Sequence, residues 1–151
     1  MPQTTPRDRA IEVGAWLLET SHRTLLTLTG GRFPKRLIGM QPVELVTVGR
    51  KTGQRRSTLL TAPICDEQRV VLVASKGGHS DDPLWYKNLA ANPDVDIIVN
   101  GTARHLRART ASAEEKAALW PQITATYKGY EGYQRATTRD IPVVICEPVA
   151  P

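Results

Sequence analysis

The chain has 151 residues, and 20 lysines and arginines against 15 aspartates and glutamates give it a net charge of +5 and a pI of about 9.5. This length predicts one domain with its own core. The charge favours an acidic partner, such as a phosphorylated ligand, a nucleic acid or an anionic membrane surface. Two cysteines, scattered histidines and the lack of a long apolar run argue against a disulfide framework, a metal centre and a membrane span, so we expect a cytoplasmic protein.

Residues 1–30 are expected to form an N-terminal segment with an amphipathic helix, and residues 31–151 the main domain. Apolar side chains, Trp16 among them, fall near one face of residues 9–28. One interpretation is that this helix docks on the main domain. The other is peripheral contact with the inner face of the cell membrane.

The pattern then changes to β-branched and alternating residues. Strands are expected at residues 43–48, 58–64, 69–74, 94–99, 102–110 and 141–146. The first three are expected to form an antiparallel meander. Asn100 and Gly101 are a strong signal for a hairpin between the fourth and fifth.

Two helices are expected among these strands. Asp82 is expected to cap a short helix that has Pro83 in its first turn and ends at Asn92. Ser112 and Glu115 match a capping box and open the second helix. Short strands joined by hairpins favour a mainly β protein, a small antiparallel barrel whose openings the helices cover.

Residues 49–56 form a basic turn between the first two expected strands, with Arg50, Lys51, Arg55 and Arg56. Its two glycines permit positive φ and close backbone approach. Guanidinium and ammonium groups beside unpaired backbone N–H groups suit phosphate or carboxylate. A solvated hairpin tip is the plainer interpretation of the turn alone, and an anion-binding site is the other.

Two further segments add to the second interpretation. Residues 74–78, Ala-Ser-Lys-Gly-Gly, place small residues and a cation at the end of an apolar strand. Tyr127, Tyr130 and Tyr133, spaced by three, lie on one side of a helix or series of turns. Phenol rings offer a flat apolar surface and a hydrogen-bond donor, which suits a ring-shaped polar substrate. The tyrosines are either the lining of a mobile lid or anchors that hold a loop to the core.

Five motifs in order carry a resemblance to a known family. The chain resembles the actinobacterial deazaflavin-dependent nitroreductases and quinone reductases, which use the 5-deazaflavin coenzyme F420. The motifs are Gly-Arg-Lys-Thr-Gly-Gln at 49–54, Ala-Ser-Lys-Gly-Gly at 74–78, Pro-Leu-Trp-Tyr-Lys-Asn-Leu-Ala-Ala-Asn-Pro at 83–93, Trp-Pro at 120–121, and Ile-Pro-Val-Val-Ile-Cys-Glu-Pro at 141–148. The resemblance implies a split antiparallel β-barrel similar to FMN-binding proteins, with covering helices.

The resemblance also implies roles for individual residues. The coenzyme would be held by Arg50, Lys51 and Arg56 at its phosphate and acidic tail, by Ser75, Lys76, Gly77 and Gly78 along its ring and ribityl chain, and by Leu84, Trp85 and Asn88, which complete the pocket. The substrate side would consist of Thr61, Tyr127, Tyr130 and Tyr133, with Tyr133, Tyr130 and Ser75 as the catalytic hydrogen-bonding groups. By residue chemistry alone, Trp85 is more simply a core residue.

Two residues depart from the family pattern. Arg55 stands where compared members have proline, which predicts a more cationic turn. Thr61 stands where the nitroreductases have a tyrosine. The expected reaction is therefore hydride transfer from reduced F420 to a quinone, with nitroaromatics as further candidates.

Three other interpretations were weighed. A non-catalytic protein of the same fold could bind a flavin, with FMN as the alternative cofactor, a deazaflavin, or haem. A nucleic-acid-binding module is permitted by the charge, but no aromatic platform stands on a strand, so no nucleic acid partner is expected. Membrane tethering through residues 9–28 concerns location and is compatible with the enzyme.

Overall fold

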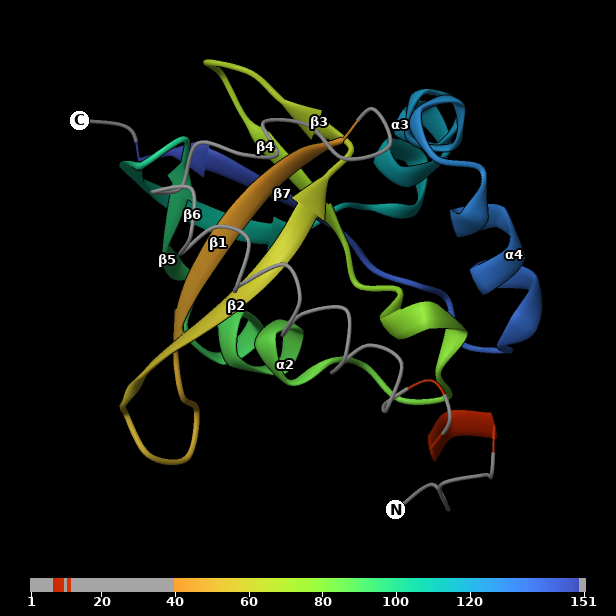
Figure 1. Cartoon of the computed structure of the whole chain (residues 1–151), viewed down its shortest axis with the longest axis horizontal. Helices are drawn as coiled ribbons and strands as arrows, with labels where there is room; N and C mark the ends of the chain where they lie inside the picture. The colour runs from red at the N-terminus through yellow and green to blue at the C-terminus, as the bar shows by residue number, and fades with distance from the viewer. Residues whose placement is uncertain (1–6, 10, 12–39, 150–151) are drawn as a thin grey trace.

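The computed structural model describes residues 7–9, 11 and 40–149, and within them one antiparallel sheet curls around a core (Figure 1). The strands are β1 (Gln41–Val48), β2 (Arg55–Ala62), β3 (Ile64–Cys65), β4 (Val70–Val73), β5 (Asp94–Val99), β6 (Thr102–Thr110) and β7 (Val143–Pro148). Their order is β2-β1-β5-β6-β7-β4-β3. The helices are η1 (Lys76–Gly78, a 3-10 turn), α2 (Leu84–Ala91), α3 (Ala113–Thr126) and α4 (Gly129–Ala136).

The sheet is curled because its two edge strands, β2 and β3, are consecutive in the chain and separated by Pro63 alone. Proline has no N–H to donate, so it interrupts a strand ladder. Before Pro63 the chain pairs with β1, and after it Ile64 and Cys65 pair with β4. The single strand expected at 58–64 is therefore divided. The expected meander of three strands is met in part: β2 pairs with β1, and Ile64 of the expected second strand pairs with Val71, but β4 pairs with β3 and β7 and not with β2.

Both hairpins signalled by glycine are present. Asn100 and Gly101 have φ of 49° and 81° and join Val99 to Thr102, as a two-residue turn between right-twisted strands requires. In the basic turn, the N–H of Gly49 donates to the carbonyl of Gln54 at 2.7 Å. The mainly β split-barrel class expected from the sequence is confirmed.

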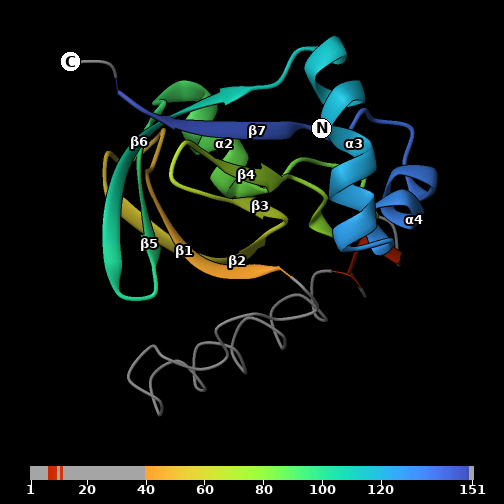
Figure 2. The ribbon, with the colours of Figure 1, turned by 90° about the horizontal axis from the view of Figure 1, so that it is seen from above.

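The core has two parts because β4 and β7 are covered on both faces. Alternate side chains, such as Leu72 and Val144, face the first cluster inside the curl, where Trp85 of α2 is also buried. Their neighbours, such as Val71 and Ile145, face the second cluster beneath α3 and α4. These two helices lie together on one side of the sheet (Figure 2). The buried position of Trp85 agrees with its interpretation as a core residue.

The predicted N-terminal cap is present at α3 and absent at α2. Ser112 and Glu115 form the predicted capping box of α3. Asp82 does not cap α2: Pro83 occupies the N-cap position, and the Asp82 carboxylate binds Arg139 instead. The amphipathic helix expected at residues 9–28 lies outside the described residues, apart from Arg9 and Ile11. Among the described residues, no helix combines the length and the apolar character needed to span a membrane.

Candidate functional site

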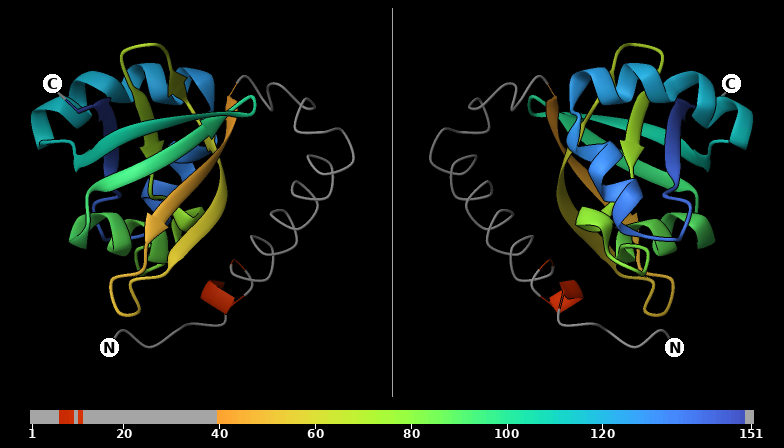
Figure 3. Two further views of the ribbon diagram at one scale, coloured as in Figure 1. Left: turned by 90° about the vertical axis from the view of Figure 1, so that its left-hand side faces the viewer. Right: turned by 90° about the vertical axis from the view of Figure 1, so that its right-hand side faces the viewer.

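The basic turn between β1 and β2 is fastened to α2 by Asn88. The side-chain oxygen of this buried residue accepts a hydrogen bond from the backbone N–H of Arg50 at 3.2 Å, and the Arg50 guanidinium lies 3.5 Å from the same oxygen. The amide nitrogen of Asn88 lies 3.5 Å from the hydroxyl of Thr47 on β1. The turn and α2 accordingly lie at the same end of the barrel (Figure 3). Two motifs that are far apart in the sequence thus meet.

The charge of this turn is largely uncompensated. Arg50, Lys51 and Arg56 are exposed, and none forms an ion pair with a carboxylate of the described residues. Arg55 differs, because its guanidinium bonds the carboxylate of Asp96 on β5 at 2.8 Å. This contact and His105 lower the pKa of Asp96. Arg55 therefore brings an additional positive charge to the turn, but one that is paired with a neighbouring acid.

Residues 75–78, the glycine turn from here on, follow β4 directly. Lys76, Gly77 and Gly78 all have positive φ, at 45°, 61° and 81°. Two glycines in such a run keep side chains off the backbone, which allows another flat or chain-like group to approach. Ser75 is buried, with 9% of its surface exposed.

The glycine turn packs against α4. A Cβ on Gly78 would lie 3.0 Å from the carbonyl oxygen of Tyr133 and 3.0 Å from the Cβ of Ala136. Close backbone approach here therefore requires glycine. As a result, the segment expected to hold the coenzyme ring adjoins the helix that carries the substrate-side tyrosines.

The N-terminal residues that are described reach the same region. The buried carboxylate of Asp8 accepts hydrogen bonds from the backbone N–H of Ser80 at 3.2 Å and from its hydroxyl at 2.9 Å. Arg7 donates to the carbonyl of Ala136 at 3.1 Å. A Cβ on Gly77 would meet the Ile11 side chain at 2.9 Å. Docking of the N-terminal segment on the main domain was one interpretation of the sequence, but no local pattern specified the glycine turn as the place of contact.

The three tyrosines form one cluster at the start of α4 and just before it. Ring centroids lie 5.2 Å apart for Tyr127 and Tyr130 and 6.2 Å apart for each of the other pairs. The hydroxyls of Tyr127 and Tyr133 lie 3.1 Å apart, and that of Tyr130 donates to the Met40 sulfur at 3.3 Å. Tyr130 is buried in the second core cluster, which agrees with the anchoring interpretation for that residue. A hydrogen bond with Thr61 also reaches Tyr130, so all four residues expected on the substrate side come together.

Burial raises the pKa of two of these phenols, Tyr130 and Tyr133. It raises the pKa of Tyr133 to about 12, with the hydrogen bond to Tyr127 acting in the same direction. It raises the pKa of Tyr130 still further, and the hydrogen bond with Thr61 opposes this only in part. At neutral pH both groups are therefore protonated, with the Tyr130 proton donated to the Met40 sulfur and the Tyr133 hydroxyl hydrogen-bonded to Tyr127.

These raised pKa values predict a loss of stability in alkali. An unfolded tyrosine ionises near pH 10, whereas the folded protein keeps the Tyr133 proton up to about pH 12. The unfolded state then binds fewer protons, so the free energy of unfolding falls as pH rises from about 10 to about 12. Urea denaturation across this range should show a shallower fall in the Tyr130→Phe/Tyr133→Phe variant. Tyr86→Phe, which changes a tyrosine outside the cluster, is the control, and equal slopes in all three proteins would contradict the prediction.

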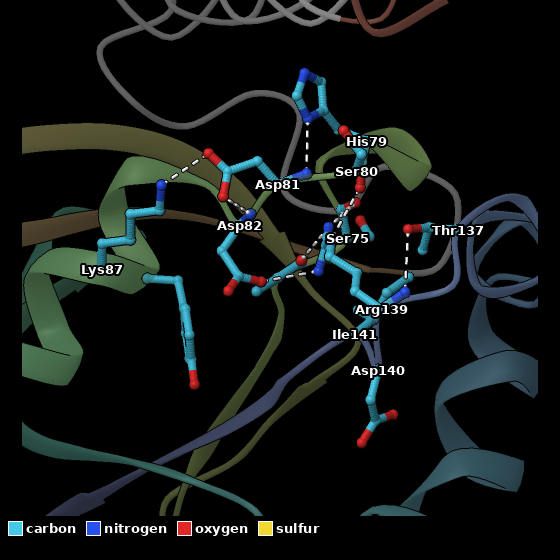
Figure 4. Close-up of polar contacts among 12 residues, drawn as sticks. Ser75, His79, Ser80, Asp81, Asp82, Lys87, Thr137, Arg139, Asp140 and Ile141 are labelled. Carbon is cyan, nitrogen blue, oxygen red and sulfur yellow. Dashed lines mark hydrogen bonds and ion pairs between the residues drawn. The ribbon is translucent and has the colours of Figure 1, made fainter. Parts of the chain in front are cut away.

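Arg139, between α4 and β7, is a structural residue that the sequence analysis missed (Figure 4). Its guanidinium donates to the carbonyls of His79 at 2.8 Å, Ala74 at 3.2 Å and Ser75 at 2.9 Å, and to the Asp82 carboxylate at 2.9 Å. Next along this loop, Asp81 accepts from Lys87 of α2 at 2.8 Å, which lowers the Asp81 pKa. No local pattern marks Arg139, because its partners are 57 to 65 positions away.

The remaining predicted site residues, Leu84, Trp85 and Lys76, differ widely in exposure. Leu84 exposes 65% of its surface at the start of α2, and Trp85 beside it is 7% exposed. Lys76 is half-buried in the glycine turn. The structure therefore gathers the predicted residues in two groups, the basic turn with Asn88 and the glycine turn with the tyrosines. The loop that Arg139 and Lys87 fasten connects them.

The curled antiparallel sheet and its helices define the class of this protein, a split β-barrel. A family model described as F420H(2)-dependent quinone reductase matches residues 16–148. The chain belongs to this family of oxidoreductases, whose coenzyme is F420, and the resemblance seen in the sequence is confirmed.

Individual proteins agree with this assignment. The chain is 39% identical to an F420H(2)-dependent quinone reductase of Mycobacterium tuberculosis, over 88% of this chain and 91% of that protein. A solved F420-H2 dependent reductase, FDR-A, matches with a TM-score of 0.64 and 34% identity, over 70% of this chain and 93% of that one. HutZ of Vibrio cholerae, a haem storage protein, is 12% identical with a TM-score of 0.53 and covers 73% of this chain and 82% of its own. At that identity the likeness concerns the fold alone, and the haem-binding alternative is not favoured.

Proposed function

We propose that this chain transfers a hydride from reduced F420 to a quinone bound beside the tyrosine cluster. The observation that carries the proposal is the direct packing of the glycine turn against α4 at Gly78 and Tyr133. A coenzyme ring along the turn and an acceptor beside the phenols would then be neighbours. Holding two reactants in the right orientation is the main contribution that a protein makes to cofactor chemistry.

The basic turn suits the coenzyme's phosphate and acidic tail. Arg50, Lys51 and Arg56 are exposed and form no ion pair with a carboxylate of the described part of the chain. Their charge is thus available to an anionic ligand. Asn88 would act indirectly, since its side-chain oxygen fixes the backbone at Arg50.

The glycine turn suits the ring and ribityl chain. Positive φ at Lys76, Gly77 and Gly78 turns the backbone sharply here. Ile11 and α4 fill the Cβ side of the two glycines, so the ring would lie along the remaining side of the backbone. We assign the flanking positions Leu84 and Trp85 to the same pocket, Leu84 as exposed apolar surface and Trp85 as buried support. When bound, reduced F420 supplies the hydride, and the protein orients the partners and excludes water.

The residues on the substrate side fit an oxygen acceptor. Tyr133 keeps its proton at neutral pH, so it can donate a hydrogen bond to an oxygen on which negative charge develops. Tyr130 would take the same role only by exchanging its hydrogen bond to the Met40 sulfur for one to the substrate. Ser75 would provide a further hydroxyl. The nitro group of an aromatic ring offers the same kind of oxygen, so nitroaromatics belong to the proposed substrate class. Thr61, smaller than tyrosine, favours quinones.

The decisive experiment is binding of oxidised F420 to the purified protein, followed by anaerobic oxidation of the reduced coenzyme with menadione. Saturable binding and menadione-dependent oxidation are expected. FMN and haem are titrated in parallel, and binding of either in place of F420 would overturn the proposal. Co-sedimentation with anionic vesicles, with and without residues 1–30, tests the separate proposal that the N-terminal segment contacts a membrane.

A further inference from the structure

We propose that Arg139 is a positioning residue for the coenzyme, which holds the glycine turn in the orientation that receives the ring. This inference rests on the proposed function, because it takes the glycine turn as the ring site. Arg139 lies in the segment that joins α4 to β7, and Figure 4 shows its side chain directed at the loop after β4.

The hydrogen bonds of Arg139 fix the direction of two peptide groups. Its Nη2 donates to the carbonyls of Ala74 at 3.2 Å and Ser75 at 2.9 Å. In a trans peptide, the C=O and the N–H that follows it point in opposite directions. The N–H groups of Ser75 and Lys76 are therefore turned away from the guanidinium. Arg139 thus sets the orientation of the two peptide planes that lead into the proposed ring site.

The glycine turn needs such a support. Lys76 adopts φ of 45°, a left-handed conformation that costs free energy for a residue with a Cβ. Backbone of this kind persists only where the surroundings hold it. Arg139 binds the chain on both sides of the left-handed run, at Ser75 before it and at the His79 carbonyl after it, 2.8 Å from Nε.

Lysine cannot reproduce this arrangement. Arg139 uses Nε, Nη1 and Nη2 together, on three carbonyls and the Asp82 carboxylate. A guanidinium presents five donors in a rigid plane, whereas an ammonium is a single point with three. The side chain is only 14% exposed, so an unmet carbonyl here would be poorly solvated. Asp82 balances the charge at 2.9 Å.

Arg139 is itself held by the helices on the substrate side. The Gln134 amide of α4 donates to the Arg139 carbonyl at 2.8 Å and accepts from the Ile141 N–H at 3.0 Å. Lys116 of α3 donates to Gln134 at 3.0 Å and to the Ile141 carbonyl at 2.7 Å. Because α4 also carries Tyr133, one polar network sets the glycine turn relative to that phenol.

The test compares Arg139→Lys and Arg139→Gln with Arg135→Gln, which removes an exposed arginine from α4 and lies outside the network. Amide hydrogen exchange of residues 74–82 is measured in the coenzyme-free proteins. The F420 dissociation constant and the menadione KM are then measured in the holoenzymes. Thermal unfolding of each protein reports the overall fold.

We expect exchange at residues 74–82 to accelerate at least about tenfold in both Arg139 variants and not in the control, because local opening follows the lost hydrogen bonds. The F420 dissociation constant should rise about tenfold in Arg139→Lys and about 100-fold in Arg139→Gln, while the menadione KM stays within about twofold. A residue that supported only the general fold would not separate coenzyme affinity from substrate KM in this way.

The outcomes separate this inference from the proposed function. If the wild type does not bind F420, the proposed function is contradicted. The exchange rates then show only whether Arg139 holds the glycine turn in place. Unchanged exchange, or unchanged F420 affinity in a wild type that binds it, overturns the positioning role. If Arg139→Gln does not fold, the exchange rates and F420 affinities of Arg139→Lys and Asp82→Asn decide whether Arg139 has the positioning role. The second of these removes only the carboxylate charge and should accelerate exchange two- to threefold.

Discussion

Replacing Lys51 and Arg56 together with alanine is expected to weaken F420 binding by about 10- to 100-fold, or about 1.4 to 2.8 kcal/mol. Both side chains are exposed in the basic turn and bind no carboxylate of the described residues, so their full charge is available to an anionic ligand. Exposed charges are screened by salt, so the difference between variant and wild type should shrink at high ionic strength. Titration of F420 followed by absorbance, at two salt concentrations, measures both effects.

The matched control for this variant is Arg107→Ala/Arg135→Ala. It removes the same two positive charges from exposed positions on β6 and α4. The control should bind F420 within about twofold of the wild type, because neither arginine belongs to the basic turn and exposed charges that do not contact the ligand are strongly screened by water and salt. Equal losses in both double variants would mean that net charge attracts the coenzyme and that the basic turn is no specific site.

Replacing Gly78 with alanine is expected to lower the free energy of unfolding by about 2 to 5 kcal/mol. The left-handed conformation, with φ of 81°, costs about 1 to 2 kcal/mol for a residue with a Cβ. The new methyl group would also lie 3.0 Å from both Tyr133 and Ala136, and overpacking of this kind costs about 1 to 3 kcal/mol. Coenzyme binding should fall with it, since the glycine turn must move away from α4. Urea denaturation and F420 titration measure the two losses.

Gly53→Ala is a close control for the backbone contribution. Gly53 has φ of 71°, but a Cβ there meets nothing within 4 Å. The Gly53→Ala variant should lose only the conformational contribution to the free energy of unfolding, about 1 to 2 kcal/mol. If both variants lose the same amount, the contact between the glycine turn and α4 is looser than the structure indicates.

Local signals in the sequence correctly predicted many of the elements. Asn100 and Gly101 specified a hairpin because both positions need positive φ, which asparagine and glycine tolerate best. Ser112 and Glu115 specified the start of α3 because each side chain satisfies a backbone group three residues away. The motif order, read as a resemblance, supplied the family and the split-barrel class, and both are confirmed.

The failures share one feature, a distant partner. Asp82 is of a residue type that often caps helices and precedes α2, yet it binds Arg139, which lies 57 positions further on. Arg55 was expected to add free charge, yet Asp96 balances it from another strand. The stretch at 58–64 was expected to be one strand, yet Pro63 lets the chain pair with β1 on one side and β4 on the other. Pro63 is a local signal for a break in that stretch, but no signal within a few residues shows which distant partner each of these segments takes.

The sequence by itself determined the turns, the α3 capping box, the alternation of most strands and the residue types of the site, because each depends on neighbours along the chain. The tertiary structure alone decided how the site is assembled. Asn88 joins the basic turn to α2, and Gly78 brings the ring segment against Tyr133. Arg139 fastens that segment to the chain beyond α4. These contacts form because a curled sheet brings distant segments together, where burial makes an unmet polar group costly and so selects specific partners.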